Sequence, residues 1–163
     1  MKTSPIPDND IERVCAVRGL HLLDTAPEER FDRLTQEAIK RFKVPISTIT
    51  LVDKDREWFK SAQGINTKQG PRDVSFCGHA LMSEIMLVIP DTLADPRFFD
   101  NPMVQGEPFI RFYAGKSLYD REHNLPVGVF CIKDHKPRQM SVTDMADFLE
   151  LAERAEKEVN RKV

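Results

Sequence analysis

The sequence predicts an α+β domain built on a mostly antiparallel sheet of five to six strands, with the end helices on one face and loops on the other. Three observations support this class. Short runs rich in β-branched residues alternate with helix-forming segments, brief polar turns favour hairpins, and the clearest helical patterns stand near the two ends of the 163-residue chain. A chain of this length suits one domain, so we expect residues 1–163 to form a single unit.

Two helices are expected ahead of the first strand. Residues 8–10, Asp-Asn-Asp, offer N-caps to the first, and apolar residues recur at helical spacing until Gly19. We therefore place the N-terminal helix within residues 1–22. The stretch T-A-P-E has the form of a capping box, Thr25 with Glu28, and opens the second helix. The apolar face of that helix consists of Phe31, Leu34, Ala38, Ile39 and Phe42.

The next segments predict a hairpin and a short isolated strand. The β-branched run I-S-T-I-T-L-V indicates an inner strand over residues 46–52. A polar turn at residues 53–55 joins it to a hairpin partner over residues 56–62. Residues 64–73 contain Gly-Pro and are expected to form a loop. M-L-V-I, residues 86–89, is expected to be a short buried strand.

A second hairpin is expected nearer the C-terminus. Its strands are residues 110–118 and residues 127–133, joined by a turn at residues 120–124. Alternation along the first strand places two sets of side chains on opposite faces: Ile110, Phe112, Ala114 and Leu118 on one, and Arg111, Tyr113 and Ser117 on the other. Gly128 in the second strand is expected to let another group approach closely.

Residues 141–163 predict the longest helix. Ser141 and Asp144 form an S-x-x-D start, and apolar residues follow mostly at spacings of three and four. Three charged pairs in the favourable i,i+4 orientation add support: Glu150–Arg154, Glu153–Lys157 and Glu158–Lys162. No Gly or Pro stops this pattern, so the helix is also a candidate connector to an output domain absent from this chain.

The composition favours a cytoplasmic domain and disfavours several function classes. The formal net charge is −2, with 40% hydrophobic and 31% charged residues, which argues against a general nucleic-acid or anionic-membrane surface. No run of about 18 apolar residues predicts a membrane span. The N-terminal M-K-T-S-P-I-P-D-N-D lacks the apolar region of a signal peptide. The widely spaced Cys15, Cys77 and Cys131 indicate free thiols in a reducing compartment.

The sheet face away from the end helices is expected to bind an unidentified small molecule beneath the long loop of residues 91–108. The candidate pocket residues come from motifs on that side: Phe76, Cys77, His79, Asp91, Arg97, Arg111 and Tyr113. An arginine and a tyrosine on one strand face suit charge-assisted binding of an anion. A structural interpretation stays open, in which Asp91 caps the next segment and Arg97 pairs with an aspartate.

The stretch S-F-C-G-H-A-L combines a cysteine and a histidine. Ser75 is expected to cap a short helix that continues to about Glu84. Cys77 is then either a packed core thiol or a thiol whose ionised form the helix dipole favours. His79 points about 200° away from Cys77 on a helix, which disfavours a Cys–His dyad. No C-x-x-C or H-x-x-x-H spacing supports a metal site, so we expect no metal, and no cofactor is assigned.

Several motifs, taken in order, resemble those of GAF domains. They are L-D-T-A-P-E-E-R-F-D-R-L-T from Leu23, V-P-I-S-T-I-T-L-V-D-K-D-R-E-W-F-K-S from Val44, S-F-C-G-H-A-L from Ser75, V-I-P-D-T-L-A-D-P-R-F from Val88, I-R-F-Y-A-G from Ile110 and G-V-F-C-I-K-D from Gly128. The resemblance covers the chain from about Leu20 to Leu151. It implies a GAF/PAS-like α/β sandwich and a regulatory module like those N-terminal in bacterial diguanylate cyclases and sensor histidine kinases. Such a module binds a ligand or transmits a signal to an output domain.

Two other functions stay open beside that of a sensor. Some free-standing GAF proteins reduce free methionine sulfoxide with several cysteines around the pocket, and Cys77 lies near such a position. Residues 91–108 supply no resolving thiol, however, and Cys131 is expected to be a core residue. Alternatively, the terminal helices form a homodimer and the domain is a ligand-free connector. No nucleotide-phosphate motif, cyclase signature or bilin-attachment pattern is present, so we expect no enzymatic activity.

Overall fold

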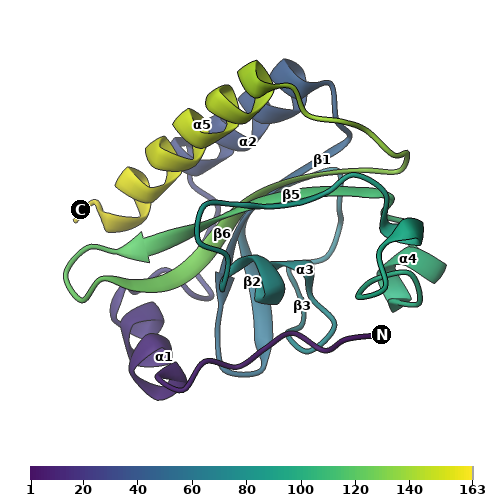
Figure 1. Ribbon diagram of the computed structural model, residues 1–163. Helices are drawn as coiled ribbons and strands as arrows, with labels where there is room; N and C mark the ends of the chain where they lie inside the picture. Colours follow the sequence, from purple (N-terminus) through teal and green to yellow (C-terminus); the bar gives the residue numbers. More distant parts are fainter. Residues whose placement is uncertain (163) are drawn as a thin grey trace.

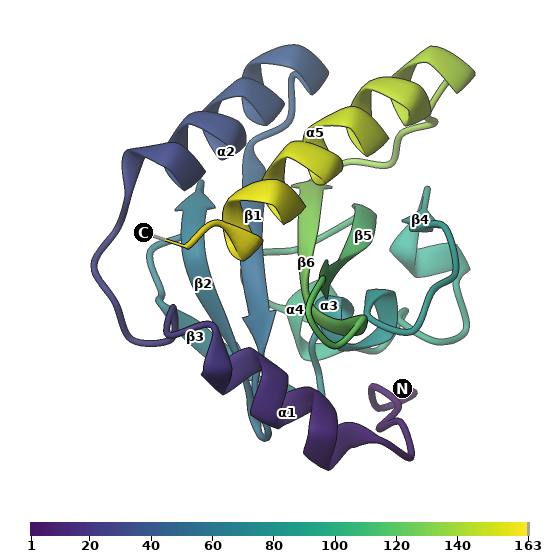
Figure 2. The same ribbon diagram turned by 90° about the vertical axis from the view of Figure 1, so that its left-hand side faces the viewer.

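The computed structural model describes residues 1–162 and places a six-stranded antiparallel sheet between two layers (Figures 1 and 2). The strand order is β3-β2-β1-β6-β5-β4, so the two longest hairpins meet where β1 pairs with β6. The strands are β1 Ile46–Val52, β2 Arg56–Gln63, β3 Gln69–Pro71, β4 Leu87–Ile89, β5 Phe112–Asp120 and β6 Leu125–Asp134. The predicted α+β fold with an antiparallel sheet is confirmed.

Long helices and short helices cover opposite faces of this sheet. The long helices are α1 Asp10–Gly19, α2 Glu29–Phe42 and α5 Val142–Asn160, and the short ones are α3 Phe76–Ala80, the 3-10 turn η1 Thr92–Ala94 and α4 Pro102–Gln105. Helices α2 and α5 lie side by side across the sheet in Figure 2, and α1 packs at the ends of β1 and β6. We call the α2/α5 side the back and the α3 side the front.

The back core forms because alternate residues of the inner strands are apolar. Ile49 and Leu51 of β1, with Phe130 and Ile132 of β6, belong to one buried cluster with α2 and α5. Phe148 of α5 packs on both Phe130 and Phe42, with ring centroids 5.4 Å and 6.1 Å apart. Burying aromatic rings of this size supplies much of the free energy that holds a helix on a sheet. The predicted apolar face of α2 is confirmed.

The predicted end of α1 agrees with the structure, but the predicted start of α2 does not. Helix α1 ends at Gly19, as predicted. Helix α2 begins only at Glu29, so the predicted Thr25–Glu28 capping box is wrong. The Thr25 hydroxyl instead donates to the Leu22 carbonyl at 2.5 Å and accepts from the Lys60 ammonium at 2.7 Å. This buried lysine competes for the oxygen that would have capped the helix.

Three further boundaries differ from the prediction. Residues 64–73 contain β3, which pairs with the start of β2; its proline is tolerated because β3 is an edge strand. Helix α3 ends at Ala80 rather than near Glu84, since the Ser83 hydroxyl donates to the Ala80 carbonyl at 2.7 Å. Ile110 precedes β5 and joins the front core, so the predicted alternation begins only at Phe112.

The C-terminal helix starts with the predicted capping box. The Asp144 amide donates to the Ser141 hydroxyl, and the Ser141 amide donates to the Asp144 carboxylate, both at 3.0 Å. Of the predicted charged pairs, Glu153–Lys157 is present at 4.0 Å. Arg154 instead pairs with Glu37 of α2 at 3.0 Å, because the two helices lie side by side. The helix ends at Asn160, and the predicted end at residue 163 lies outside the described residues.

Gly128 illustrates how closely β1 and β6 approach. A Cβ at this position would meet the backbone carbonyl oxygen of Thr50 on the neighbouring strand. We expect Gly128→Ala to lower the free energy of unfolding by roughly 2 kcal/mol or more, because both backbones are held by the sheet. Gly19→Ala is the matched control: no atom lies within 4 Å of the added Cβ, and stability should stay level or rise by up to about 1 kcal/mol. Urea denaturation of both variants tests this, and equal midpoints would contradict the steric explanation.

Candidate functional site

A group of ionisable side chains is enclosed between the front face of the sheet and helix α3. We call Glu57, Cys77, Tyr113, Cys131 and Lys133 the buried polar cluster; none of them is more than 4% exposed. They meet because Tyr113 of β5 and Cys131 of β6 face the front, while their even-numbered neighbours Phe112, Ala114, Phe130 and Ile132 fill the back core. The cluster therefore draws on four separate elements: β2, α3, β5 and β6.

Each thiol of the cluster has a hydroxyl neighbour of its own: Tyr113 for Cys77 and Thr48 for Cys131. The Tyr113 hydroxyl donates to the Cys77 Sγ at 3.4 Å. The same hydroxyl lies over Gly115, where a Cβ would collide with it, and Gly115 is the strand partner of Cys131. On the other side, the Thr48 Oγ1 lies 2.9 Å from the Cys131 Sγ. Glycine at position 115 is thus what lets the tyrosine reach across the sheet.

Burial shifts the ionisation of the cluster in opposite directions. It raises the pKa of Glu57 to about 8, helped by Cys77 and opposed by the positive charge of Lys133. Burial also opposes ionisation of Cys131, yet contact with Cys77 and the nearby Lys133 ammonium lower its pKa to about 7. Burial disfavours the charge on Lys133, but Cys131, Cys77 and Glu57 together raise its pKa. At neutral pH the cluster therefore holds a protonated carboxyl, a cationic ammonium and a thiol poised to ionise.

The cluster has polar atoms that its own members do not satisfy. Within residues 1–162, the Oε1 of Glu57 and the Oγ of Ser117 are buried without a hydrogen-bond partner. Lys133 and Glu57 form no ion pair in the part of the chain that the structure describes, although each shifts the pKa of the other. A buried polar atom without a partner is costly, so the unsatisfied Glu57 Oε1 marks the cluster as a candidate functional site.

The predicted site residues Phe76, Cys77 and Tyr113 are brought together. The Phe76 ring stacks between Phe98 at 4.7 Å and Tyr113 at 5.2 Å, and this column roofs the cluster. His79 lies on the outer side of the roof, with its ring edge-on to Phe98 at 4.7 Å and its Nε2 3.1 Å from the Lys2 carbonyl. Cys77 and His79 therefore make different contacts, as their helical spacing predicts.

Asp91, Arg97 and Arg111 organise the loop of residues 91–108 instead of pointing to the cluster. The Asp91 carboxylate caps η1 by accepting from the Leu93 amide at 3.1 Å. Arg97 pairs with Asp95 at 2.7 Å. Arg111 donates to the Val104 carbonyl at 2.8 Å. The structural interpretation of Asp91 and Arg97 thus describes their observed contacts.

Glu57, Cys131 and Lys133 are absent from the predicted site. Cys131 was expected to be a core residue, and it belongs to the buried front core, where it also contacts the Thr48 hydroxyl. A lysine ending an inner strand, and a glutamate opening one, are unusual in a core and are the signals in the sequence that point to these positions. Period-2 alternation from Tyr113 and Cys131 would have placed Lys133 on the same face.

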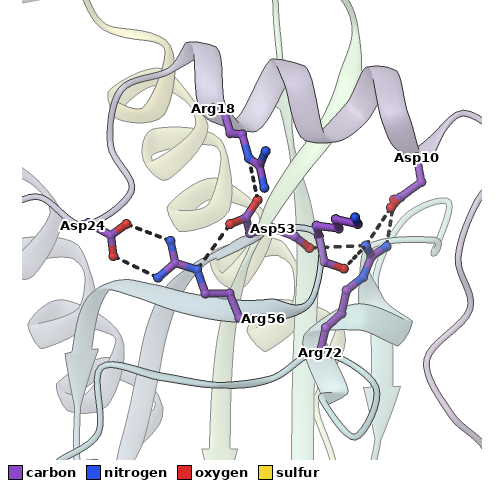
Figure 3. A network of polar contacts seen from close by, with 7 residues as sticks. Asp10, Arg18, Asp24, Asp53, Arg56 and Arg72 are labelled. Carbon is purple, nitrogen blue, oxygen red and sulfur yellow. Dashed lines mark hydrogen bonds and ion pairs between the residues drawn. The ribbon is translucent and has the colours of Figure 1, made fainter.

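A second set of charges fastens α1 to the front layer (Figure 3). The Arg72 guanidinium is 3% exposed at its side chain and binds both oxygens of Asp10 on α1, each at 2.8 Å. It also donates to the carbonyls of Asp53 and Lys54 in the β1–β2 turn. The carbonyl of Arg72 accepts from the hydroxyl of Ser75, which caps α3. Arg72 therefore joins α1, the β1–β2 turn and the roof of the cluster.

Further ion pairs lie along the same end of the sheet, and in them arginines alternate with aspartates. Asp53 accepts from Arg18 of α1 at 3.1 Å and from Arg56 of β2 at 3.3 Å, and Arg56 binds both oxygens of Asp24. Figure 3 shows these side chains in one row below α1. Arg18 is 59% exposed at its side chain, so this outer contact is weak compared with the buried Arg72–Asp10 pair.

Helix α5 is hydrogen-bonded to the end of strand β5, next to the β5–β6 turn. The Tyr119 amide donates to the Glu156 carboxylate at 2.7 Å, and the Asn160 side-chain amide donates to the Tyr119 carbonyl at 2.8 Å. A groove of about 1480 Å³ separates this end of α5 from α1. Because Tyr119 and Tyr113 share strand β5, the C-terminal helix and the buried polar cluster are joined by one rigid element.

Comparison with known proteins identifies the family. The GAF domain model matches residues 26–159. The chain belongs to the GAF domain family. A cyclic di-GMP phosphodiesterase of Pseudomonas aeruginosa is 40% identical over 138 residues, which are 85% of this chain and 23% of that protein. This GAF domain therefore spans about a quarter of that relative.

Solved structures agree on the fold. The GAF domain of a phosphoenolpyruvate-protein phosphotransferase from Coxiella burnetii is 13% identical, with 93% of this chain and 95% of that chain covered and a TM-score of 0.66. A free methionine-R-sulfoxide reductase from Neisseria meningitidis, solved with its substrate, is 19% identical, with 99% and 97% covered and a TM-score of 0.63. At these identities the likeness concerns the fold alone. None of the helices within residues 1–162 is both long and apolar enough to cross a membrane.

The raised pKa of Glu57 predicts a pH-dependent stability difference. The folded chain keeps this proton from about pH 4.5, the ordinary value, to about pH 8, while the unfolded chain has released it. The contribution of Glu57 to stability must therefore fall as pH rises through that window. We expect Glu57→Gln to become more stable relative to the parent protein between pH 5 and pH 8, by on the order of a few kcal/mol.

Urea denaturation at several pH values measures this difference. Cys77, Tyr113, Cys131 and Lys133 face the carboxyl in both proteins, and Glu57 acts on the pKa of Cys131 and Lys133, so the difference measures the carboxyl together with its coupling to these groups. Exposed Glu122→Gln is the charge-matched control and should follow the parent at all pH values. Parallel curves for the parent and Glu57→Gln would show that this carboxyl is ionised in the folded protein.

Proposed function

We propose that this chain is the ligand-sensing, regulatory GAF domain of a cytoplasmic bacterial signalling protein. In this proposal the buried polar cluster receives a small molecule, and the terminal helices pass the change to an output domain such as a diguanylate cyclase, a cyclic di-GMP phosphodiesterase or a histidine kinase. The observation that carries the proposal is the set of unsatisfied polar atoms enclosed on the front of the sheet. The relative's cyclic di-GMP chemistry supports a signalling context for the domain.

The chemistry of the cluster suits a small ligand with both an anionic and a hydrogen-bonding group. The Lys133 ammonium offers a positive charge in a low-dielectric site, where it binds an anion more strongly than in water. The carboxyl of Glu57 and the hydroxyl of Ser117 offer buried polar atoms that lack partners within the described residues. The aromatic column of Phe76, Phe98 and Tyr113 is closed over them, so a ligand enters by displacement of the roof.

Two connections support transmission from the cluster to the helices. The roof helix α3 reaches α1 through Arg72 and Asp10. The cluster strand β5 reaches α5 through Tyr119 and Glu156. A ligand that binds more tightly when the roof or the strand is displaced would thus act on both terminal helices, since differential affinity for two states is what shifts a population.

A hybrid enzyme tests the sensor proposal. The matching region of the Pseudomonas phosphodiesterase is replaced by this chain, and cyclic di-GMP hydrolysis is measured with and without the protein-free small-molecule fraction of a bacterial extract. We expect the rate to change by about fivefold or more when that fraction is added. Lys133→Met should abolish the response and leave the basal rate, because it removes the buried cation that the ligand contacts.

The matched control is Lys136→Met, an exposed lysine on the same side of the chain, which should respond like the parent hybrid. A hybrid that hydrolyses cyclic di-GMP equally under all conditions would refute the sensor and favour the ligand-free connector.

We also propose that the domain forms a homodimer through its terminal helices. The inward residues Val14, Val17 and Val159 of the terminal helices are buried within the domain, so the contact must use the outward faces. Ile11 is 80% exposed on α1, and it lies on the wall of the groove beside α5. An apolar side chain this exposed is available to a second copy.

Light scattering with size exclusion measures the dimer. Ile11→Glu should weaken association roughly tenfold or more, because it places a charge in the apolar contact. Val142→Glu is the control: Val142 is 84% exposed but stands at the opposite end of α5. Equal effects of the two changes, or a monomeric parent, would contradict this placement of the interface.

A second candidate function is reduction of free methionine sulfoxide. The observation in its favour is that Cys131 lies beside Cys77, so a second thiol is present where residues 91–108 supply none. Turnover of methionine sulfoxide by the parent but not by Cys77→Ser would establish it, and absence of turnover by the parent removes it.

A further inference from the structure

Two thiols lie inside the buried polar cluster although one belongs to the front layer of helices and the other to the sheet. Cys77 stands on the roof helix α3 and Cys131 on the inner strand β6, and both are 0% exposed. The Tyr113 hydroxyl touches the Cys77 Sγ and lies over Gly115, the strand partner of Cys131. Each thiol acts directly on the ionisation of the other. Two cysteines far apart in sequence that share the front core and lie on either side of one phenol are candidates for an intramolecular disulfide.

The surroundings give the two thiols different chemical roles. Hydrogen bonding with Cys131, together with burial, raises the pKa of Cys77, so this sulfur keeps its proton. Burial acts on Cys131 in the same sense, but Cys77, Lys133 and the Thr48 hydroxyl outweigh it and lower the pKa. The ionised sulfur is the nucleophile in thiol chemistry. Because Cys131 also lies 2.9 Å from the Thr48 hydroxyl and two residues before Lys133 on the same strand, we assign it as the attacking thiolate and Cys77 as the second, protonated partner.

We propose that Cys77 and Cys131 are a reactive dithiol that a small hydroperoxide converts into an intramolecular disulfide. The proposal goes beyond the sensor function, since it requires no ligand in the cluster and no output domain. It differs from methionine sulfoxide reduction in the oxidant, which here is the O–O bond of a peroxide. It assigns to the cluster a covalent modification that joins the roof helix to the sheet.

The reaction proceeds in two balanced steps. The Cys131 thiolate attacks one oxygen of the hydroperoxide, an S–O bond forms, the O–O bond breaks, and the leaving alkoxide or hydroxide takes the proton held by Glu57. The Cys77 sulfur then attacks the Cys131 sulfur, the S–O bond breaks, and the departing hydroxyl leaves as water with the Cys77 proton. Two electrons pass from the sulfurs to the peroxide, and Glu57 regains its proton from solvent.

Access is the step that the fold controls. The roof over the thiols is a helix of only five residues, Phe76–Ala80, capped by Ser75. The N-terminal segment crosses outside it: the Ser4 hydroxyl donates to the Arg72 carbonyl at 2.8 Å, and the Lys2 carbonyl contacts His79. Loosening this segment should admit the peroxide more often. Ser4→Ala is therefore expected to speed disulfide formation, although Ser4 touches neither thiol.

Disulfide mapping in the intact chain tests the proposal. Cys15 is exposed, so Cys15→Ser is used as the parent to prevent bonds between chains. The protein is treated with hydrogen peroxide, free thiols are alkylated under denaturing conditions, and peptides are analysed by mass spectrometry without reductant. We expect roughly tenfold more Cys77–Cys131 disulfide than in untreated protein, and its disappearance on reduction.

Two variants sharpen the result. Lys133→Met should slow disulfide formation about tenfold, because it removes the cation that favours the Cys131 thiolate, and Lys133→Arg should restore most of the rate. Lys136→Met serves as the surface control, and circular dichroism verifies that each variant is folded. These rates do not depend on ligand binding, so they are read separately from the hybrid-enzyme response.

Three outcomes would overturn the proposal. One is that both thiols are still free after peroxide treatment and are therefore fully alkylated. The second is that Cys77 or Cys131 gains oxygen without forming the disulfide. The third is that methionine sulfoxide yields the disulfide while hydrogen peroxide does not, which would assign the dithiol to sulfoxide reduction instead.

Discussion

The position of the whole front layer depends on the ion pair between Arg72 and Asp10. Both oxygens of Asp10 are bound by one guanidinium, which also donates to two carbonyls of the β1–β2 turn. Removing a guanidinium charge from water is costly, so these contacts to Nη1 and Nη2 are what hold Arg72 in place, while its Nε is buried without a partner among residues 1–162. Arg72 is followed closely by the cap of α3, so its placement fixes where the roof begins. Helix α1, the β1–β2 turn and helix α3 are therefore held together through Arg72.

The two cores of the domain have different physical purposes. The back core is a continuous apolar cluster in which Phe42, Phe130 and Phe148 interlock. The front core is also buried, but it encloses Glu57 and Lys133, two groups that an apolar filling would replace with a gain in stability. Retaining them lowers the stability of the front core. The apolar back core supplies the stability that allows this.

Periodicity made the back of the domain predictable and left the front obscure. The helical repeat of α2 and the alternation of Phe112, Ala114 and Leu118 depend on local spacing, so they can be recognised in the sequence. Phe76, Cys77 and Tyr113 were chosen as pocket candidates from the motifs that contain them, and the structure places their side chains in contact. Glu57 and Lys133 meet them only because β2, β1 and β6 pair in a particular register, and no local pattern specifies such a meeting.

The two chain ends attach to different layers, and this gives the domain a directional mechanical response. The N-terminal segment is bonded to the roof, through Ser4 to Arg72 and Lys2 to Arg97, whereas α5 is packed into the back core. Tension applied at the N-terminal segment would therefore first separate α3 from the sheet and expose the buried polar cluster to water. Tension applied at α5 would instead act on the aromatic residues of the back core. A load on the N-terminal segment therefore controls access to the cluster, whereas a load on α5 acts on the stability of the whole domain.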